Sequence, residues 1–419
     1  MKRQAGPAIL ATLVALLLCM PSGCPAKVRQ AVDRRPVDHQ SLETAADVIE
    51  FPFRLVSDHI VLSASINGSD EMDMLLDTGM PMRGAILLDP SLADGIDLEY
   101  VGTVDLGGGG SDTPKTADVA ARATISISGT EFTGQRLMIL REGGFADDWP
   151  VGAIIGRTIF ERVVEIDFDT SVIKLYASID EMPEGPGEKL KMDFTMGIPV
   201  IDATVKSAPG RALPISLIAD TGVNDSFLLF TYSDKGLKLP DQTLRCKGGI
   251  LGEGITGDMM GSLGRTPELE LGPFTLTDII TGYPDESTMG HAAMLGQNGF
   301  VGIGIMKRFT VVFDYGQEAF YLKPGRSYRE PFEWNMAGLL VWVNRDGFLQ
   351  VKDTVEASPG WDIGIRPGDV ITAIDGNNIN EMTNAEVFEA FARDGAEVSL
   401  TILRDTERRT VSLKLRRLI

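Results

Sequence analysis

Two aspartate motifs are the residues best suited to chemistry in this chain of 419 residues. Residues 74–79 read Met-Leu-Leu-Asp-Thr-Gly, and residues 217–222 read Leu-Ile-Ala-Asp-Thr-Gly. In each copy an apolar run typical of a strand ends at the aspartate, and the glycine allows a sharp turn. Two carboxylates held close together share one proton and can activate a water molecule between them. The repeat predicts a catalytic acid pair, Asp77 and Asp220, that hydrolyses an amide bond.

The residues after the two aspartates would hold the two loops side by side. Thr78 and Thr221 each carry a hydroxyl that can hydrogen-bond across to the other loop, despite the like charge of the aspartates. Gly79 and Gly222 shape the turns. A single aspartate at the end of a strand is usually only a turn former, so the prediction depends on the matched pair.

These paired motifs resemble those of the aspartic peptidases, and more the compact retropepsin-like bacterial forms than the long eukaryotic pepsins. In that family an apolar-apolar-Gly segment lies beside each active loop and is followed by a short helix and a hairpin. Residues 154–156 (Ile-Ile-Gly) and 300–302 (Phe-Val-Gly) match this segment, and residues 158–174 and 304–321 follow them. The resemblance covers residues 48–325 and reads as the internal repeat of a whole lobe.

Glycine-rich segments in both lobes are candidates for flaps that cover a bound peptide. The first comprises Gly107, Gly108, Gly109 and Gly110; the second runs over residues 247–257, with Gly248, Gly249 and Ile250 as its candidate residues. The first segment lacks the following lysine and helix start that a phosphate loop requires. A mobile flap and a plain surface loop fit its sequence equally well.

The last part of the chain resembles a bacterial PDZ domain over residues 332–419. The residues that carry this resemblance are Gly-Ile-Arg-Pro-Gly-Asp-Val-Ile at 364–371 and Ile-Asp-Gly at 374–376. Thr383, with Glu386 three residues later, is typical of a capped helix start. PDZ domains bind an extended peptide end as an added strand, which the resemblance places beside Gly338, Leu339, Leu340 and Val341. The alternative is that the domain only caps the lobes or mediates self-association.

Together the resemblances imply a mainly β protein. Two retropepsin-like β-barrel lobes, at residues 48–182 and 183–328, would form a bilobal aspartic-protease fold, followed by an α+β PDZ domain. Because one chain supplies both aspartates, a dimer is not required for the acid pair. Aspartic chemistry needs no cofactor and no metal, and the three histidines have no metal-ligand spacing.

Residues 1–26 are typical of an export signal, because two basic residues precede an apolar run at residues 8–20. Two processing routes remain open: lipidation at Cys24, as in bacterial lipoproteins, or cleavage after Ala26. Residues 27–47 form a polar linker. We therefore expect a protein that is either periplasmic or anchored to the cell envelope by a lipid. A lipid on Cys24 would be its only attachment to the membrane.

The net charge of −20 argues against nucleic acid as a partner. The sequence predicts an exported aspartic endopeptidase that cuts extended polypeptide and binds peptide C-termini through its PDZ domain. The alternatives are a catalytically silent peptide-binding protein and a narrow processing enzyme. Met80 and Val223 stand where the family usually has Ala or Ser; this predicts a pH optimum nearer neutral, and Met80 could crowd the site.

Overall fold

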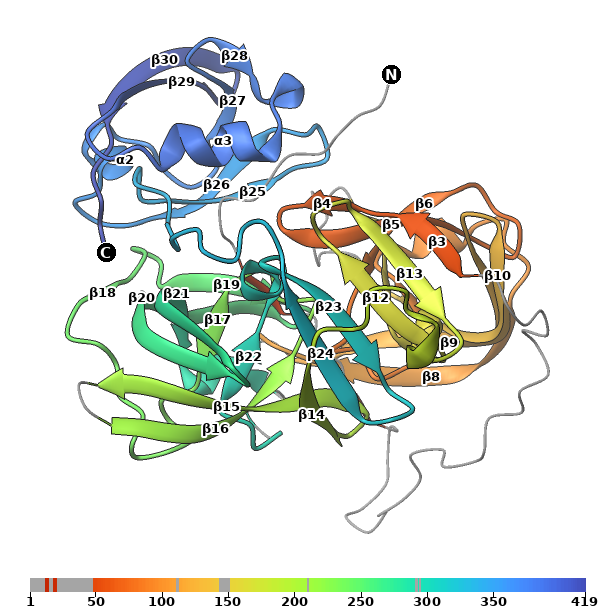
Figure 1. Cartoon of the computed structure of the whole chain (residues 1–419). Helices are drawn as coiled ribbons and strands as arrows, with labels where there is room; N and C mark the ends of the chain where they lie inside the picture. Colours follow the sequence, from red (N-terminus) through yellow and green to blue (C-terminus); the bar gives the residue numbers. More distant parts are fainter. Residues whose placement is uncertain are drawn as a thin grey trace.

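The computed structural model describes residues 48–110, 113–142, 151–208, 211–290, 293 and 295–419, together with the backbone of residues 12–14 and 18–20. Of residues 208, 384 and 385 only the backbone is described. The described chain is mainly β and forms three sheets (Figure 1). Apart from those two short strands, the predictions for residues 1–47, including Cys24, lie outside the described residues. No helix within the described ranges has the length and apolar character needed to cross a membrane.

The first half of the chain supplies a nine-stranded sheet. In spatial order its strands are β2 (Leu18–Met20), β8 (Glu99–Gly107), β9 (Lys115–Ile127), β10 (Thr130–Leu140), β7 (Gly84–Leu87), β11 (Ala153–Ile155), β6 (Met72–Leu76), β5 (His59–Ile66) and β4 (Arg54–Val56). Asn67 and Gly68 join β5 to β6 with positive φ angles of 48° and 77°. Such residues favour a tight hairpin, which directs β6 toward Asp77.

The second half forms most of a fifteen-stranded sheet. Its order is β1 (Thr12–Val14), β19 (Ile250–Gly254), β20 (Gly257–Leu271), β21 (Phe274–Pro284), β17 (Phe227–Leu229), β22 (Gly299–Val301), β16 (Arg211–Ala219), β15 (Ile198–Ala208), β14 (Glu188–Thr195), β24 (Ala319–Pro324), β23 (Phe309–Asp314), β12 (Val163–Asp167), β13 (Val172–Tyr176) and β3 (Ile49–Pro52), with β18 (Thr243–Leu244) beside β20. Strands β3, β12 and β13 come from the first half, so both halves share this sheet.

The strand pairings of the two halves repeat. Strand β6 pairs in parallel with β11, as β16 does with β22. Strand β11 also pairs with β7 in antiparallel fashion, as β22 does with β17. A short helix follows each inner strand, η2 (Arg157–Ile159) and α1 (Ile303–Met306), and then a hairpin. The last three residues of β6 and of β16 are apolar and buried, so each strand enters the core just before its aspartate.

The third sheet belongs to a C-terminal domain, drawn in blue in Figure 1. Its order is β25 (Leu339–Val343), β26 (Leu349–Thr354), β27 (Val370–Ile374), β29 (Glu397–Arg404) and β30 (Glu407–Lys414), with β28 (Asn377–Asn378) beside β27. Its helices are α2 (Pro359–Asp362) and α3 (Asn384–Phe391). Helix α3 begins with the predicted capping box between Thr383 and Glu386. Further 3-10 turns are η1 (Pro90–Ala93), η3 (Ile179–Glu181), η4 (Glu286–Thr288) and η6 (Ile379–Glu381).

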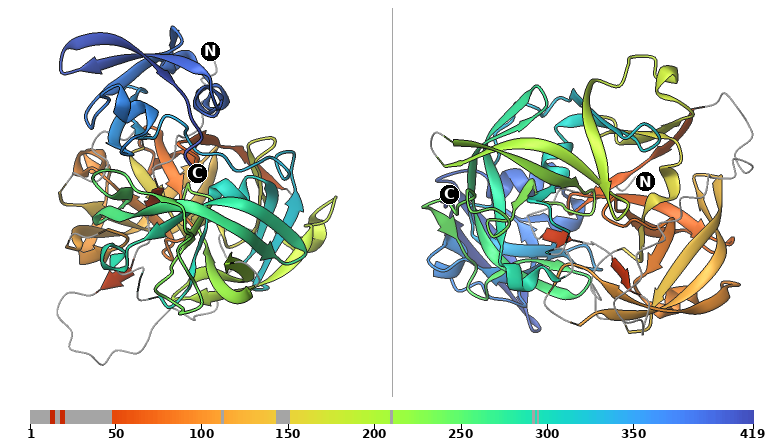
Figure 2. Two further views of the ribbon diagram at one scale, coloured as in Figure 1. Left: turned by 90° about the vertical axis from the view of Figure 1, so that its left-hand side faces the viewer. Right: turned by 90° about the horizontal axis from the view of Figure 1, so that it is seen from below.

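The hydrophobic core follows the same division. One large buried cluster contains residues of both the nine-stranded and the fifteen-stranded sheet. It also includes Leu340 and Val355 of the C-terminal domain. A separate cluster fills that domain, with Val351, Ile371 and Phe391 among its members. Figure 2 shows the C-terminal domain seated against one side of the two larger units. The domain thus has its own core and also shares apolar contacts with the lobes.

Candidate functional site

The two motif aspartates occupy equivalent places in the two halves. Asp77 directly follows β6 and Asp220 directly follows β16. The Asp77 N–H donates to the carbonyl of Ile155 at 2.9 Å, and the Asp220 N–H donates to the carbonyl of Val301 at 3.0 Å. Each aspartate is therefore held where a buried strand leaves the sheet, and neither is exposed to solvent.

The threonines join the two loops. The Thr78 N–H donates to Thr221 Oγ1 at 3.0 Å, and the Thr221 N–H donates to Thr78 Oγ1 at 2.9 Å. The Thr78 hydroxyl donates to the carbonyl of Ala219, and the Thr221 hydroxyl to that of Leu76, at 2.7 Å and 2.8 Å. Each hydroxyl thus accepts one hydrogen bond and donates another across the junction, as the sequence predicted.

The glycines allow the two carboxyl groups to meet. A methyl group added to Gly79 would lie 2.5 Å from Asp220 Oδ2, and one added to Gly222 would lie 2.7 Å from Asp77 Oδ1. Each glycine therefore makes room for the carboxyl group of the opposite loop. The N–H groups of Gly79 and Gly222 both donate to Asp220 Oδ1, at 3.2 Å and 2.8 Å.

The two carboxyl groups differ in their surroundings. Both oxygens of Asp77, and Oδ2 of Asp220, receive no hydrogen bond from the N–H and hydroxyl groups of the described residues. Burial raises the pKa of Asp77 well above its ordinary value, the charge of Asp220 raises that pKa further, and the backbone amides of Gly79 and Met80 oppose the rise. Burial also raises the pKa of Asp220, but hydrogen bonds from Asp77 and from the two glycine amides oppose this rise. Burial thus favours a protonated carboxyl group in both aspartates, and a pair this close holds one proton more readily than none.

Met80 and Val223 fill the core behind the loops. A methyl group on Gly156 would lie 2.9 Å from Cγ of Met80, and one on Gly302 would lie 2.8 Å from Cγ1 of Val223. Both side chains are fully buried. Met80 belongs to the apolar cluster of the first half that includes Leu75, so the crowding considered for it is taken up by packing against Gly156.

Two hairpins, β8–β9 and β19–β20, meet at their tips. The carbonyl of Gly109 accepts hydrogen bonds from the N–H and the hydroxyl of Thr256, at 3.1 Å and 2.9 Å. The Gly110 N–H donates to the carbonyl of Thr288 at 3.1 Å. Ile255 is fully buried and packs in the apolar cluster of the first half. The predicted run Gly107 to Gly110 lies at the end of β8, where it makes these contacts.

The structure corrects the place of the second candidate flap. Gly248, Gly249 and Ile250 lie at the base of hairpin β19–β20, where the N–H groups of Gly248 and Ile250 donate to Asp353 of the C-terminal domain. The tip is formed instead by Ile255 and Thr256, between the two strands. The signal that could have found it was the position of this pair between Gly254 and Gly257, near the end of the glycine-rich run.

Both hairpins also accept an extended chain along an edge. Residues 12–14 pair in parallel with β19, from Gly252 to Gly254. Residues 18–20 pair in antiparallel fashion with β8, from Asp105 to Gly107. The second view of Figure 2 shows these two short strands, in red, between the two large units. The edges of β8 and β19 are thus suited to backbone pairing with extended polypeptide.

An acidic group that sequence reasoning missed lies next to the second loop. Asp225 is buried, and burial together with the charge of Asp58 raises its pKa to about 8. Asp58 forms an ion pair of 2.7 Å with Lys307. The side-chain amide of Asn224 donates to the carbonyl of Ser57 at 3.0 Å. These contacts link the two halves, but no pattern in the sequence relates Asp58 to Asp225.

The four residues predicted to bind peptide in the C-terminal domain lie at a sheet edge. Gly338 has a φ of 73°, and a methyl group there would lie 2.2 Å from Cβ of Ser358. Leu339, Leu340 and Val341 begin β25, whose only strand partner in the described part of the chain is β26.

Comparison with known proteins supports the C-terminal assignment. Residues 350–404 match the PDZ domain family. No curated protein matches the chain. Among solved structures, a photosystem II D1 C-terminal processing protease is similar over 20% of this chain and 24% of its own length, with 20% identity and a TM-score of 0.19. A likeness of that extent carries no argument about the lobes. The C-terminal domain is thus a PDZ domain.

Proposed function

We propose that this protein is an aspartic endopeptidase whose two lobes have the retropepsin-like fold. The observation that carries the proposal is the meeting of Asp77 and Asp220 on two loops joined by Thr78 and Thr221. Three of the four carboxyl oxygens lack another donor among the described residues. A proton shared between the two groups would satisfy one oxygen of each, as the chemistry of such a pair requires.

The unequal surroundings of the two carboxyl groups assign them different roles. Asp220, whose Oδ1 accepts two backbone amides, would be ionised and would take a proton from the attacking water. Asp77 would hold a proton and donate it to the carbonyl oxygen of the substrate. When the tetrahedral intermediate collapses, Asp220 would pass its proton to the leaving amine. One hydroxyl of the intermediate would return its proton to Asp77 as the carbonyl of the new carboxylic acid forms, so the pair would again hold one proton.

The substrate proposed for the cleft is extended polypeptide. The pairing of residues 12–14 and 18–20 with the hairpins β19 and β8 supports this class of substrate. The PDZ domain would bind peptide or protein C-termini beside β25, as PDZ domains do by strand addition. No second copy of the chain is needed to complete the acid pair.

We also propose that the protein is exported and acts in the periplasm or at the cell envelope. This proposal rests on the sequence of residues 1–26 and on the alternatives of a lipid at Cys24 or cleavage after Ala26. Under either route residues 12–14 and 18–20 are absent from the mature chain. The hairpin edges that they cover would then be open to substrate.

The test is the cutting of an unfolded protein by residues 27–419 between pH 3.5 and pH 8. The variants Asp77→Asn and Asp220→Asn should each lower the rate by about a thousandfold or more, because neither amide can exchange the shared proton. The control is Asp97→Asn, which changes an exposed aspartate on the first lobe and should cut at the rate of the parent. Cutting that survives in either active-loop variant would rule out the acid pair.

One observation favours a second candidate, a catalytically silent peptide-binding protein. The two carboxyl groups are fully buried, and the tips of hairpins β8–β9 and β19–β20 are hydrogen-bonded to each other. A parent protein that binds extended peptide but cuts nothing in the same pH range would establish this function.

A further inference from the structure

The PDZ domain forms direct hydrogen bonds with the base of hairpin β19–β20. The Lys247 N–H donates to the carbonyl of Thr354 at 2.7 Å. The Gly248 N–H reaches both carboxylate oxygens of Asp353, at 3.1 Å and 2.9 Å, and the Ile250 N–H reaches Oδ2 at 3.4 Å. Asp353 is only 2% exposed. A buried carboxylate of the PDZ domain therefore accepts hydrogen bonds from the backbone at the base of hairpin β19–β20.

The fit at this contact is close. A methyl group on Gly248 would lie 2.7 Å from Asp353 Oδ2. Only glycine at this position therefore lets the carboxylate come close enough to accept the Gly248 N–H. Cys246 and Val355 add an antiparallel bridge beside it. The segment before β19 thus pairs, through its backbone, with the end of β26 and the residue that follows it.

The strand that carries Asp353 is the partner of the proposed peptide-binding strand. Asp353 pairs with Leu340, and Thr354 pairs with Leu339, across β26 and β25. The register shifts between Leu340 and Val341, next to this pair. A peptide added to the free edge of β25 would therefore be one strand away from Asp353, and two strands away from the hairpin base.

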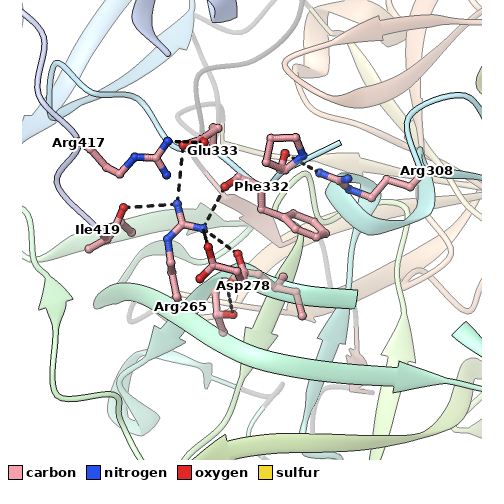
Figure 3. Close-up of polar contacts among 10 residues, drawn as sticks. Arg265, Asp278, Arg308, Phe332, Glu333, Arg417 and Ile419 are labelled. Atoms are coloured by element: carbon pink, nitrogen blue, oxygen red, sulfur yellow. Dashed lines mark hydrogen bonds and ion pairs between the residues drawn. The ribbon is translucent and has the colours of Figure 1, made fainter. Parts of the chain in front are cut away.

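Two arginines prevent the PDZ domain from pivoting freely on the lobes. Figure 3 shows Arg265 of β20 donating to the carbonyls of Phe332 and Ile419, at 3.0 Å and 3.3 Å. Glu333 forms ion pairs with Arg265 and Arg417, at 3.7 Å and 2.6 Å. The end of the domain and the segment that leads into it are thus fixed to the same strand of the second half.

The second arginine acts on the same connecting segment. Arg308 donates to the carbonyls of Ser327 and Pro331, at 3.1 Å and 3.2 Å, and to that of Glu330. Its guanidinium lies 3.6 Å from the centre of the Phe332 ring. These contacts tie the connecting segment to the same part of the second half that carries β20 and α1.

From these contacts we propose that peptide binding in the PDZ groove controls the hairpin β19–β20 through Asp353. A strand added to β25 orders the β25–β26 edge, which tightens the hold of Asp353 on Gly248 and Ile250. The hairpin is then fixed at its base as well as at its Thr256 tip, so the closed cleft is favoured. The coupling is reciprocal, so a cleft ligand strengthens PDZ binding by the same factor. The inference rests on the peptide-binding role proposed for the PDZ domain, but not on cleavage.

Amide hydrogen exchange tests this coupling without any need for catalysis. The probe is a peptide selected from a C-terminal display library for binding to residues 27–419, and its amidated form serves as the unbound control. Binding of the free-carboxylate peptide should slow exchange at Gly248 and Ile250 by about fivefold or more. A selection that yields no carboxylate-dependent peptide, or unchanged exchange in the peptide-saturated protein, overturns the proposal.

Two variants break the contact from opposite sides. Asp353→Asn removes one of the two acceptor oxygens, and Gly248→Ala pushes the hairpin base away without altering the PDZ domain. Both should bind the peptide and lose the slowed exchange. The matched control is Asp375→Asn, since Asp375 accepts the Ser399 N–H within the PDZ domain, at 2.8 Å, away from the hairpin. Slowed exchange that persists in Gly248→Ala would contradict the proposed route even if Asp353→Asn fails to fold.

If the parent cuts, the same peptide should lower KM about fivefold in the parent and leave KM unchanged in Gly248→Ala. A KM that is unchanged or raised in the parent argues against the coupling. If the parent does not cut at all, the proposed protease function fails, while the exchange experiment still decides whether the PDZ domain and the hairpin are coupled.

Discussion

Thr78 and Thr221 exchange hydrogen bonds in a symmetric pattern, with each N–H donating to the other hydroxyl, at 3.0 Å and 2.9 Å. Both residues are fully buried. The pattern joins segments that lie 143 residues apart in the chain. It holds two acidic groups together in a place where burial and like charge oppose their ionisation.

Removing one hydroxyl should weaken the junction strongly. Thr78→Val keeps the shape of the side chain but leaves the Thr221 N–H and the carbonyl of Ala219 without partners. Two buried unsatisfied groups should lower the free energy of unfolding by about 2–5 kcal/mol. Thr78→Ser keeps the hydroxyl and should lose about 1 kcal/mol or less by this contact. Urea unfolding measures both; equal losses in the two variants would show that the hydroxyl does not stabilise the junction.

The pH dependence of cutting should reach toward neutral pH. The pKa values of Asp77 and Asp220 are both raised, with burial as the first cause. Since activity requires one proton on the pair, a raised pKa extends the active range upward. No hydroxyl follows either Asp-Thr-Gly to oppose this, because Met80 and Val223 stand there. The pH dependence of kcat/KM measures the range, and a maximum below about pH 4 would contradict the expectation.

The contact between the hairpin tips should control access to the cleft. A methyl group on Gly254 would lie 2.0 Å from the carbonyl oxygen of Gly109, so Gly254→Ala must separate the tips. We expect KM for an extended peptide to rise about tenfold, because the covering hairpins no longer meet. The free energy of unfolding should also fall, because Ile255, which follows Gly254, packs in the apolar cluster of the first half.

The control for this substitution is Gly316→Ala, in the turn between β23 and β24, where an added methyl group meets only Asp314 Oδ1 at 3.4 Å. It should leave KM at the parent value. A Gly254→Ala variant that also keeps the parent KM would mean that tip contact does not limit substrate binding.

Much of the local structure could be predicted because it depends on short patterns. The apolar runs before Asp77 and Asp220, the Asn67-Gly68 turn and the capping box at Thr383 each act within a few residues. The internal repeat places the two acids at equivalent positions of two similar units. These features are set by backbone preference and by strand burial, which the sequence displays directly.

The remaining contacts depend on residues distant in sequence and lack a pattern of their own. Asp353 reads as an ordinary polar residue of a strand, and only the fold shows that it faces Gly248. The same holds for Asp58 and Asp225, which lie far apart in the chain. The glycine run at residues 247–257 indicates a pliable hairpin, but it does not say that its first residues bond to another domain while Thr256 forms the tip.

Asp225 should make the stability of the protein depend on pH. Its pKa is raised to about 8 by burial and by the charge of Asp58, whereas an unfolded aspartate titrates near 4. A raised folded pKa stabilises the protein fully below about pH 4, and this contribution is lost as the pH rises toward about 8. Asp225→Asn carries no titrating proton, so its stability relative to the parent should increase by about 2–4 kcal/mol between pH 4.5 and pH 7.5.

Urea unfolding of the parent and Asp225→Asn at these two pH values measures the difference. Other buried acids, Asp77 and Asp220 among them, titrate in both proteins and cancel in the comparison. The exposed substitution Asp97→Asn should follow the pH dependence of the parent. If Asp225→Asn also follows the pH dependence of the parent, then Asp225 is ionised in the folded protein. In that case Asp225, Asp58 and Lys307 all carry a charge where the two halves meet.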